Sequence, residues 1–281
     1  MTVQGGAATA GEQAMEWRDQ GVLLAARPHG EGSMIIEVLT EAHGRHSGVV
    51  RGGQSSRLGA TMQPGSQLTL EWRARLEDHI GSYKIEPLKM RASMLMEDRH
   101  ALAGFNALSS LVVAFVPERE ADFDLYEATL EMIEALCSRP RGWQGLYVMW
   151  ETVFLSTLGF GLDLSRCAAT GVRHDLAYLS PRTGRAVCRE SGGPYAARLL
   201  DLPPFMVGEG VVTMAGVRTG LRTVGWFLEN RVCPAMEREH LPEARQRFLD
   251  GLRDVELASR EQPGPQADLA PWYRRLGIER R

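Results

Sequence analysis

A run of five short segments near the start of the chain restricts the fold more than any other feature. Apolar and polar residues alternate in parts of each segment, and Gly or Pro bounds nearly all of them, a pattern typical of half-buried β-strands. The segments lie at 21–30, 32–40, 46–53, 65–76 and 80–90. Five short strands in about 75 residues favour a small closed or half-closed barrel over an open sheet. Barrels of this kind often bind single-stranded nucleic acid in a charged groove, which points to a binding function without any catalytic residue.

The length and composition of the chain are those of an ordinary globular protein. It has 281 residues, enough for two or three domains, and 44% of them are hydrophobic and 24% charged. Its apolar runs are far shorter than the ~18 residues that a membrane span needs. Residues 1–14 are small and polar, with no Lys, no Arg and no apolar core, so they do not resemble a secretory signal. We expect them to form a disordered leader.

Helical spacing replaces the alternating pattern after residue 92. Leu95, Leu102, Phe105, Leu108 and Val112 fall three, four or seven residues apart. Apolar residues surround the whole axis of the third helix, which predicts a place at the centre of a helical core. The pattern predicts helices over 93–116, 122–140, 142–163, 195–200, 216–230 and 242–255.

The stretch 164–192 differs from the helices around it because it is rich in turns. Two short strands, 174–181 and 184–190, form a predicted hairpin. The expected architecture is therefore α+β: a barrel domain at 15–91 and a helical domain at 92–255 that carries this hairpin insert. Beyond it, 256–281 is Pro-rich and charged, so we predict a flexible tail in which Trp272 and Tyr273 would dock locally.

Nucleic-acid binding by this chain has to come from a local patch, because the net charge is −3 and the segment 16–90 holds nine basic and nine acidic residues. The cluster from Arg51 to Arg57 contains no acid, and Gly52 and Gly53 let the backbone approach phosphate closely. Trp72 and Tyr83 are candidate stacking residues, although core packing is the favoured interpretation of Trp72. The predicted DNA-binding residues are Arg45, His46, Arg51, Arg57, Arg73, Arg75, Lys84 and Lys89.

Catalytic motifs give no positive signal. The sequence lacks the P-loop pattern, the Gly-x-Ser-x-Gly elbow and the His-Glu-x-x-His zinc motif, and nothing selects a pair among its 35 acids. The four cysteines are scattered without a Cys-x-x-Cys pair. We expect no enzyme activity and no disulfide.

Four segments together resemble the RecO family of bacterial recombination mediators, which act in DNA repair. They lie at 19–53, 151–171, 178–195 and 241–249, and their order and spacing carry the resemblance from Glu16 to about Val255. The resemblance implies an N-terminal OB-fold barrel and a helical domain with a zinc-finger-like insert. It also implies binding of single- and double-stranded DNA, annealing of complementary strands, and help in loading RecA onto DNA coated by the single-stranded DNA-binding protein. RecR and the tail of the single-stranded DNA-binding protein would be partners, in the bacterial cytoplasm near the nucleoid and away from the membrane.

Some members of this family hold zinc in the insert with four cysteines in two Cys-x-x-Cys pairs. Here Cys167 stands at the first ligand position, but Thr170 follows three residues later, and Cys188 has no cysteine partner nearby. A structural zinc site needs four Cys or His ligands. We therefore expect no cofactor, and Cys167 and Cys188 remain the only candidates for a metal.

The resemblance also implies that the helical domain receives the acidic, hydrophobic C-terminal tail of the single-stranded DNA-binding protein. Recognition of such a tail needs an apolar pocket beside Arg or Lys. The candidate cations are Arg119, Arg139, Arg141, Arg218 and Arg222. Two other hypotheses stay open: a protein–protein adaptor whose barrel does not bind DNA, which the balanced charge favours, and a metal-dependent enzyme, which no motif supports.

Overall fold

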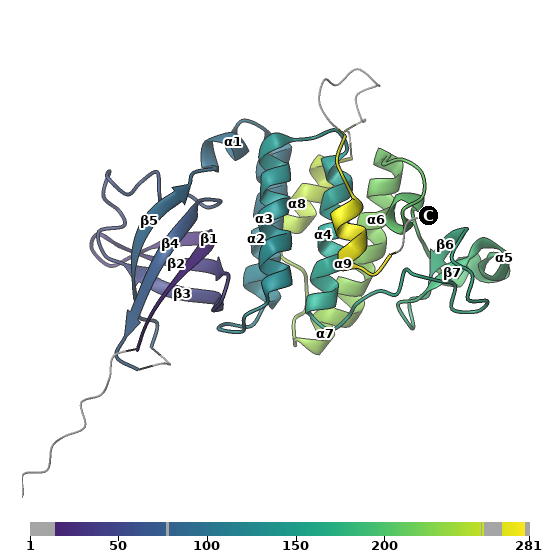
Figure 1. Cartoon of the computed structure of the whole chain (residues 1–281), viewed down its shortest axis with the longest axis horizontal. Helices are drawn as coiled ribbons and strands as arrows, with labels where there is room; N and C mark the ends of the chain where they lie inside the picture. Colours follow the sequence, from purple (N-terminus) through teal and green to yellow (C-terminus); the bar gives the residue numbers. More distant parts are fainter. Residues whose placement is uncertain (1–14, 77–78, 254, 256–265, 279–281) are drawn as a thin grey trace, which may run out of the picture.

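The computed structural model describes residues 15–76, 79–253, 255 and 266–278, so the leader predicted at 1–14 lies outside the described residues. Figure 1 shows an elongated molecule with a β-barrel at one end, a layer of helices in the middle and a small sheet at the other end. The predicted α+β class is confirmed. No helix in the described ranges is both long and apolar enough to cross a membrane.

The N-terminal barrel is closed and has the strand order β1-β2-β3-β5-β4, in which β1 pairs with both β2 and β4, and β3 pairs with β5. This is the five-stranded topology of an OB-fold, as predicted. The strands are β1 (Met15–His29), β2 (Ser33–Thr40), β3 (Gly44–Val50), β4 (Gln67–Ala74) and β5 (Ser82–Lys89).

Alternation along the strands gives the barrel its own core. In β4, Leu68, Leu70, Trp72 and Ala74 point inward, and the residues between them point outward. These side chains meet others from the remaining strands in a cluster separate from the helical core. The period-two pattern in the sequence therefore reports the inner face of the barrel.

The helical part is built around α4 (Trp143–Thr157), which is buried from Trp143 to Leu155 as its all-round apolar pattern predicts. The predicted helix over 93–116 is broken into two because Asp98 caps a new start, accepting hydrogen bonds from two backbone N–H groups at 2.8 Å. The surrounding helices are α1 (Ala92–Met96), α2 (Arg99–Phe115), α3 (Phe123–Ser138), α6 (Met214–Phe227), α7 (Cys233–Ala235) and α8 (Glu243–Gly251).

The predicted hairpin insert is present at the far end of the molecule (Figure 1). Its strands β6 (Leu176–Leu179) and β7 (Ala186–Cys188) pair antiparallel, and β8 (Leu200–Asp201) adds a third strand. A short helix, α5 (Arg189–Gly192), follows β7. The α-helix predicted over 195–200 is instead a 3₁₀ helix, η1 (Gly193–Arg198). Further irregular turns are η2 (Pro204–Val207) and the π-helical η3 (Leu228–Val232). The zinc-finger-like character of the insert stays a prediction.

The C-terminal segment 266–278 packs on the helices, so the prediction of a flexible tail is wrong there, whereas the predicted docking of Trp272 and Tyr273 is confirmed. Trp272 and Tyr273 in α9 (Ala270–Arg275) are each 2% exposed. The Tyr273 hydroxyl donates to the Phe205 carbonyl oxygen at 2.5 Å, and Arg275 forms a bidentate pair with Glu131 at 2.6 and 2.9 Å. Buried aromatic area outweighs the polar composition of this segment. Residues 256–265 and 279–281 lie outside the described residues.

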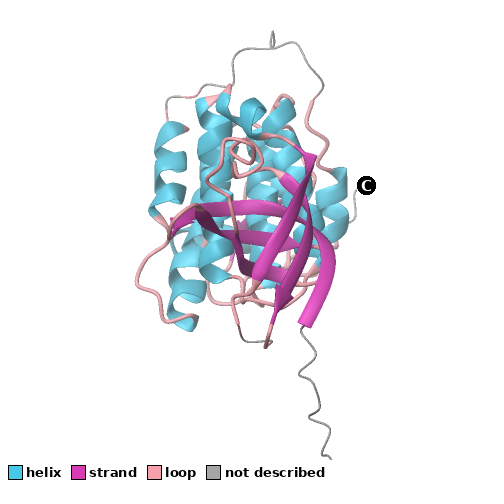
Figure 2. Cartoon of the chain, turned by 90° about the vertical axis from the view of Figure 1, so that its left-hand side faces the viewer, coloured by secondary structure: helices cyan, strands magenta, loops and turns pink. Residues whose placement is uncertain are grey.

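The barrel and the helices share part of their cores. Viewed from the barrel end, the barrel stands directly in front of the helical layer (Figure 2). Val22, Leu24 and Leu39 of the barrel belong to the helical core, and the Ser109 hydroxyl of α2 donates to the Leu24 carbonyl oxygen at 2.7 Å. Near Val22 and Leu24 the outer face of β1 is therefore covered by the helical part rather than by water.

A buried ion pair joins three helices of the core. Arg245 of α8 donates to both carboxylate oxygens of Glu151 in α4, at 2.7 and 2.8 Å, and to the Leu221 carbonyl oxygen of α6 at 2.9 Å. The two side chains are 3% and 0% exposed. Gly225 leaves room for this guanidinium group, since a Cβ there would lie 2.9 Å from its nearest nitrogen.

We expect Arg245→Leu to lower the free energy of unfolding by about 3–5 kcal/mol, because it leaves the Glu151 carboxylate buried without a counter-ion. The double replacement of Glu151 and Arg245 by Leu should lose much less, because no unpaired charge remains. Urea titration followed by circular dichroism measures both. Equal losses in the single and double variants would contradict this role of the pair.

Candidate nucleic-acid interface

The barrel is closed by a short parallel pairing of β3 with β5, which we call the seam. Only two residue pairs form it, Val49 with Ser82 and Val50 with Tyr83. Two adjoining hollows of about 610 and 550 Å³ lie along the seam and share Arg51, Arg73 and Ser82. The end of β3, the end of β4 and the start of β5 thus converge on one surface.

We call this surface the basic groove and define it by Arg51, Arg73, Arg75 and Lys84, which line the two hollows. Glu71 is the one carboxylate among the described residues that line them. Four of the eight residues predicted from the sequence to bind DNA therefore meet here, although they are up to 33 positions apart in the chain.

Glu71 organises the cations around it. Its carboxylate lies 2.5 Å from Arg73, 3.4 Å from Arg18 and 3.8 Å from Lys84. Partial desolvation raises the pKa of Glu71, but the attraction of these three cations outweighs it and holds the pKa below its usual value. Arg73 also pairs with Glu16 at 2.9 Å. Among the described residues, Arg18, Arg51, Arg73 and Lys84 still outnumber these two carboxylates, which leaves a local positive surplus although the chain as a whole is acidic.

Arg57 does not itself line the hollows. It is exposed on the long loop between β3 and β4, next to Leu58, which lines one of them. Met62 anchors this loop in the barrel core, and the Gln54 side chain donates to the Ser33 carbonyl oxygen at 2.8 Å. Gly52 has a positive φ of 70°, and no atom lies within 4 Å of the position that a Cβ would take. The backbone there is therefore open to the close approach of a ligand.

Arg45 was predicted to contact DNA, but the structure places it between the barrel and the helical part. Its guanidinium group donates to the Val116 carbonyl oxygen at 2.8 Å and pairs with Glu37 at 2.9 Å and Glu118 at 3.2 Å. The loop after α2 covers it, so its side chain is only 13% exposed. Arg45 therefore joins the barrel to the loop after α2, a role that the neighbouring sequence does not indicate.

The prediction of His46 as a DNA contact is also corrected, because the residue is 3% exposed. Its ring lies edge-on to Trp72 and to Tyr83, with centroid distances of 4.9 and 6.0 Å. The Nδ1 atom lies 2.9 Å from the Ser47 carbonyl oxygen and 3.0 Å from the Tyr83 hydroxyl. Trp72 and Tyr83 are themselves 2% and 5% exposed, so neither is a stacking platform and the core interpretation of Trp72 is confirmed.

Lys89 lies at the end of β5 that is farther from the groove. Its ammonium group pairs with Glu134 of α3 at 2.7 Å, beside the buried Arg91, whose Nε lies 3.2 Å from the same carboxylate. Arg18 reaches the groove through Glu71 and was not among the residues predicted from the sequence. Cross-strand register gives the signal, since Arg18 of β1 and Lys84 of β5 both pair with Glu71 of β4.

The two metal candidates, Cys167 and Cys188, lie next to each other in the insert. The Cys188 N–H donates to the Cys167 sulfur at 3.3 Å, and both residues are buried. Burial raises the pKa of the Cys167 thiol, but backbone and hydroxyl donors outweigh it and lower the pKa to about 6. Within the described ranges, no group of three or more His, Cys, Asp or Glu side chains could hold a metal.

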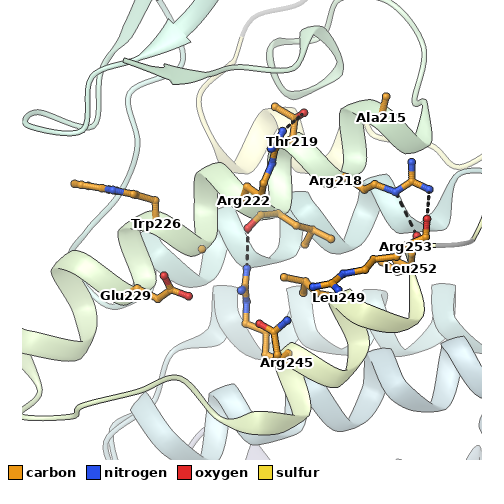
Figure 3. Close-up of a pocket in the computed structure, with 13 residues that line it drawn as sticks. Ala215, Arg218, Thr219, Arg222, Trp226, Glu229, Arg245, Leu249, Leu252 and Arg253 are labelled. Carbon is orange, nitrogen blue, oxygen red and sulfur yellow. Dashed lines mark hydrogen bonds between the residues drawn. The ribbon is translucent and has the colours of Figure 1, made fainter. Parts of the chain in front are cut away.

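A cleft of about 650 Å³ lies between α6 and α8 (Figure 3). Leu221, Trp226, Leu249 and Leu252 give it apolar walls. Of the cations that line it, Arg218 donates to the carbonyl oxygens of residues 252, 253 and 255, and Arg253 pairs with Asp250 at 2.8 Å. Arg222 is exposed. Among the described residues, its guanidinium group donates to the Thr219 hydroxyl one turn away, at 3.2 Å.

Comparison with known proteins assigns the two parts of the chain. The family model for the N-terminal part of recombination protein O matches residues 15–91, and the model for its C-terminal part matches residues 96–237. The chain belongs to the RecO family. Family membership supports a role in DNA repair and recombination, in a family of repair mediators rather than of enzymes.

Curated relatives match this chain along almost their whole length. The DNA repair protein RecO of Ruegeria sp. (strain TM1040) is 51% identical over 238 residues, which are 85% of this chain and 98% of the relative. The corresponding protein of Dinoroseobacter shibae is 49% identical with the same coverage. That of Rhodospirillum rubrum is 48% identical over 252 residues, 88% of this chain and all of the relative.

The burial of His46 makes the stability of the protein depend on pH. Burial lowers the pKa of His46 to about 4 from an ordinary 6.5. The unfolded chain therefore binds a proton that the folded chain rejects as the pH falls from 6.5 to 4, and unfolding becomes easier by up to about 3 kcal/mol. We expect the urea midpoint to fall over this range, and His46→Gln to flatten the fall. His174→Gln, at an exposed position, should follow the wild type. A His46→Gln curve parallel to the wild type would refute the assignment.

Proposed function

We propose that this protein is a DNA-binding recombination mediator of RecF-pathway repair in the bacterial cytoplasm. In this proposal it binds single- and double-stranded DNA, anneals complementary strands and helps load RecA onto DNA coated by the single-stranded DNA-binding protein. RecR and the tail of that coating protein are its partners, and RecA is an indirect one. Chemistry is not needed for such a role, because binding energy alone brings strands and partners together.

The observation that carries the proposal is the basic groove at the seam of the barrel. Arg51, Arg73, Arg75 and Lys84 offer cations to phosphates along one surface, and Ser82 adds a hydroxyl donor. Each neutralised phosphate releases counter-ions, so affinity falls with salt in proportion to the number of contacts. The local surplus of cations would let a chain with a net negative charge bind a polyanion. The adaptor hypothesis requires no such surplus.

The cleft between α6 and α8 supports the proposed contact with the acidic, hydrophobic tail. Apolar walls accept hydrophobic side chains, and Arg222 stands at the cleft with no carboxylate partner among the described residues. Arg218 and Arg253 are already engaged by carbonyl oxygens and by Asp250, so they shape the cleft more than they attract an acid. Of the cations predicted for this role, Arg222 is therefore the best placed.

We expect replacement of Arg51 and Arg57 together by Ala to weaken binding of a labelled single-stranded oligonucleotide at low salt by about tenfold or more. The slope of log affinity against log salt should flatten by about 1.4, since two phosphate contacts are lost at about 0.7 each. Fluorescence anisotropy over a salt series measures both quantities.

A matched control removes the same charge at the other end of the molecule, by replacing Arg182 and Arg198 of the insert region, both exposed, with Ala. This variant should keep the wild-type slope. Wild-type binding by the Arg51 and Arg57 variant would disprove the groove assignment. A wild-type protein that ignores oligonucleotides at low salt would favour the adaptor instead.

For the cleft, we expect Arg222→Glu to weaken binding of a fluorescent peptide of the acidic tail by at least about tenfold, because the substitution turns attraction into repulsion. Isothermal titration calorimetry measures the peptide affinity. Arg198→Glu, with the same charge change at an exposed position outside the cleft, is the control. Equal effects of the two variants would show that general charge, and not the cleft, governs the interaction.

A further inference from the structure

The hairpin between β4 and β5 presents an apolar side chain at the rim of the basic groove. Ile80 is 42% exposed and lines the same hollow as Arg51, Arg73 and Arg75. Single exposed apolar residues are common on protein surfaces and carry no meaning by themselves. The position of Ile80 differs from that general case because three separate elements fix its backbone beside a row of cations.

Those three elements hold the backbone on both sides of Ile80. The Trp72 indole of β4 donates to the Ile80 carbonyl oxygen at 3.1 Å, and the Val49 N–H of β3 donates to the Gly81 carbonyl oxygen at 3.1 Å. Arg119, from the loop after α2, donates to the His79 carbonyl oxygen at 3.1 Å. The backbone at Ile80 is therefore held in place beside the groove.

Gly81 allows this close packing against the indole. Its φ is +64°, and a Cβ there would lie 2.4 Å from the Trp72 ring nitrogen. No other residue type fits without moving the hairpin. The packing of Gly81 against the buried Trp72 thus fixes the backbone conformation in which Ile80 is exposed.

The faces of unpaired bases pack on exposed apolar or aromatic side chains of a protein. The two aromatic side chains predicted for this role do not supply such a surface. Trp72 and Tyr83 are buried, as shown above. In proteins that bend duplex DNA, Ile, Leu and Met side chains insert between base steps at a cost in unstacking, so aliphatic side chains do contact the faces of bases. Of the described residues lining the hollow that holds Arg75 and His79, Ile80 is the one that joins a large apolar side chain to substantial exposure.

We infer that Ile80 contacts the unpaired bases of a strand whose phosphates lie along the basic groove, and that it favours single strands over duplex. The inference rests on the proposed function. Paired bases in a duplex are stacked and turn their faces away from the protein, so only a single strand offers them to Ile80 without an unstacking cost.

The test compares single-stranded and duplex oligonucleotides of one length by fluorescence anisotropy, with the full chain. We expect Ile80→Ser to weaken single-strand binding by about five- to tenfold and to leave duplex binding unchanged. Its salt slope should equal that of the wild type, because Ile80 carries no charge. Ile80→Trp should tighten single-strand binding, since a larger ring stacks better on a base.

Leu88→Ser is the matched control, because Leu88 is 51% exposed on the same barrel but does not line the groove. It should bind both oligonucleotides like the wild type. An equal loss on single strand and duplex, or no loss in Ile80→Ser and no gain in Ile80→Trp, would overturn the inference. If Ile80 has no effect while the Arg51 and Arg57 variant loses binding, the inference alone fails. If the arginine variant also binds normally, the groove assignment fails with it.

Discussion

Closure of the barrel at the seam is the constraint on which the candidate site depends. β3 and β5 meet through only two residue pairs, and this pairing sets Arg51 beside Arg73 and Ser82. A longer pairing would bring the strands together along their length and fill the space that now forms the groove. A missing one would leave two sheet edges open, which is costly in backbone hydrogen bonds. The groove thus exists because the pairing of β3 with β5 is only two residue pairs long.

Beneath the seam, a cluster of rings supports the same surface from inside. Trp72 is stacked on Trp17 at a centroid distance of 5.5 Å, and Trp17 is stacked in turn on His43 at 4.1 Å. His46 fills the space between Trp72 and Tyr83 and remains neutral because of its burial. These side chains determine where the strand ends lie, and the strand ends carry the cations. Under the proposed function, the aromatic residues therefore act on DNA binding through position rather than through stacking.

Local pattern was sufficient to predict the barrel, the buried α4 and the hairpin insert, because each depends on the period of apolar residues. It failed where a partner lies far away in the chain. In β3, alternate residues are buried, so His46 shares the inward face with Val50, and this parity could have excluded it from the site. Arg45 points outward in β3, but it is covered by a loop more than 70 residues later. The helix that carries Trp272 was likewise not predicted in the polar tail, because its burial depends on helices far away in the chain.

The groove and the helical part are mechanically connected, so the barrel does not present its surface alone. Arg119 lies in a left-handed conformation with φ of 65°, and its N–H donates to the Arg45 carbonyl oxygen at 2.8 Å while its side chain holds the His79 carbonyl oxygen. The loop after α2 thus reaches both the covered face of β3 and the hairpin that borders the groove. Val22, at the start of the shared core, ties β1 to the same helices. Under the proposed function, these contacts give a partner bound at α2 a physical route to the hairpin that borders the groove.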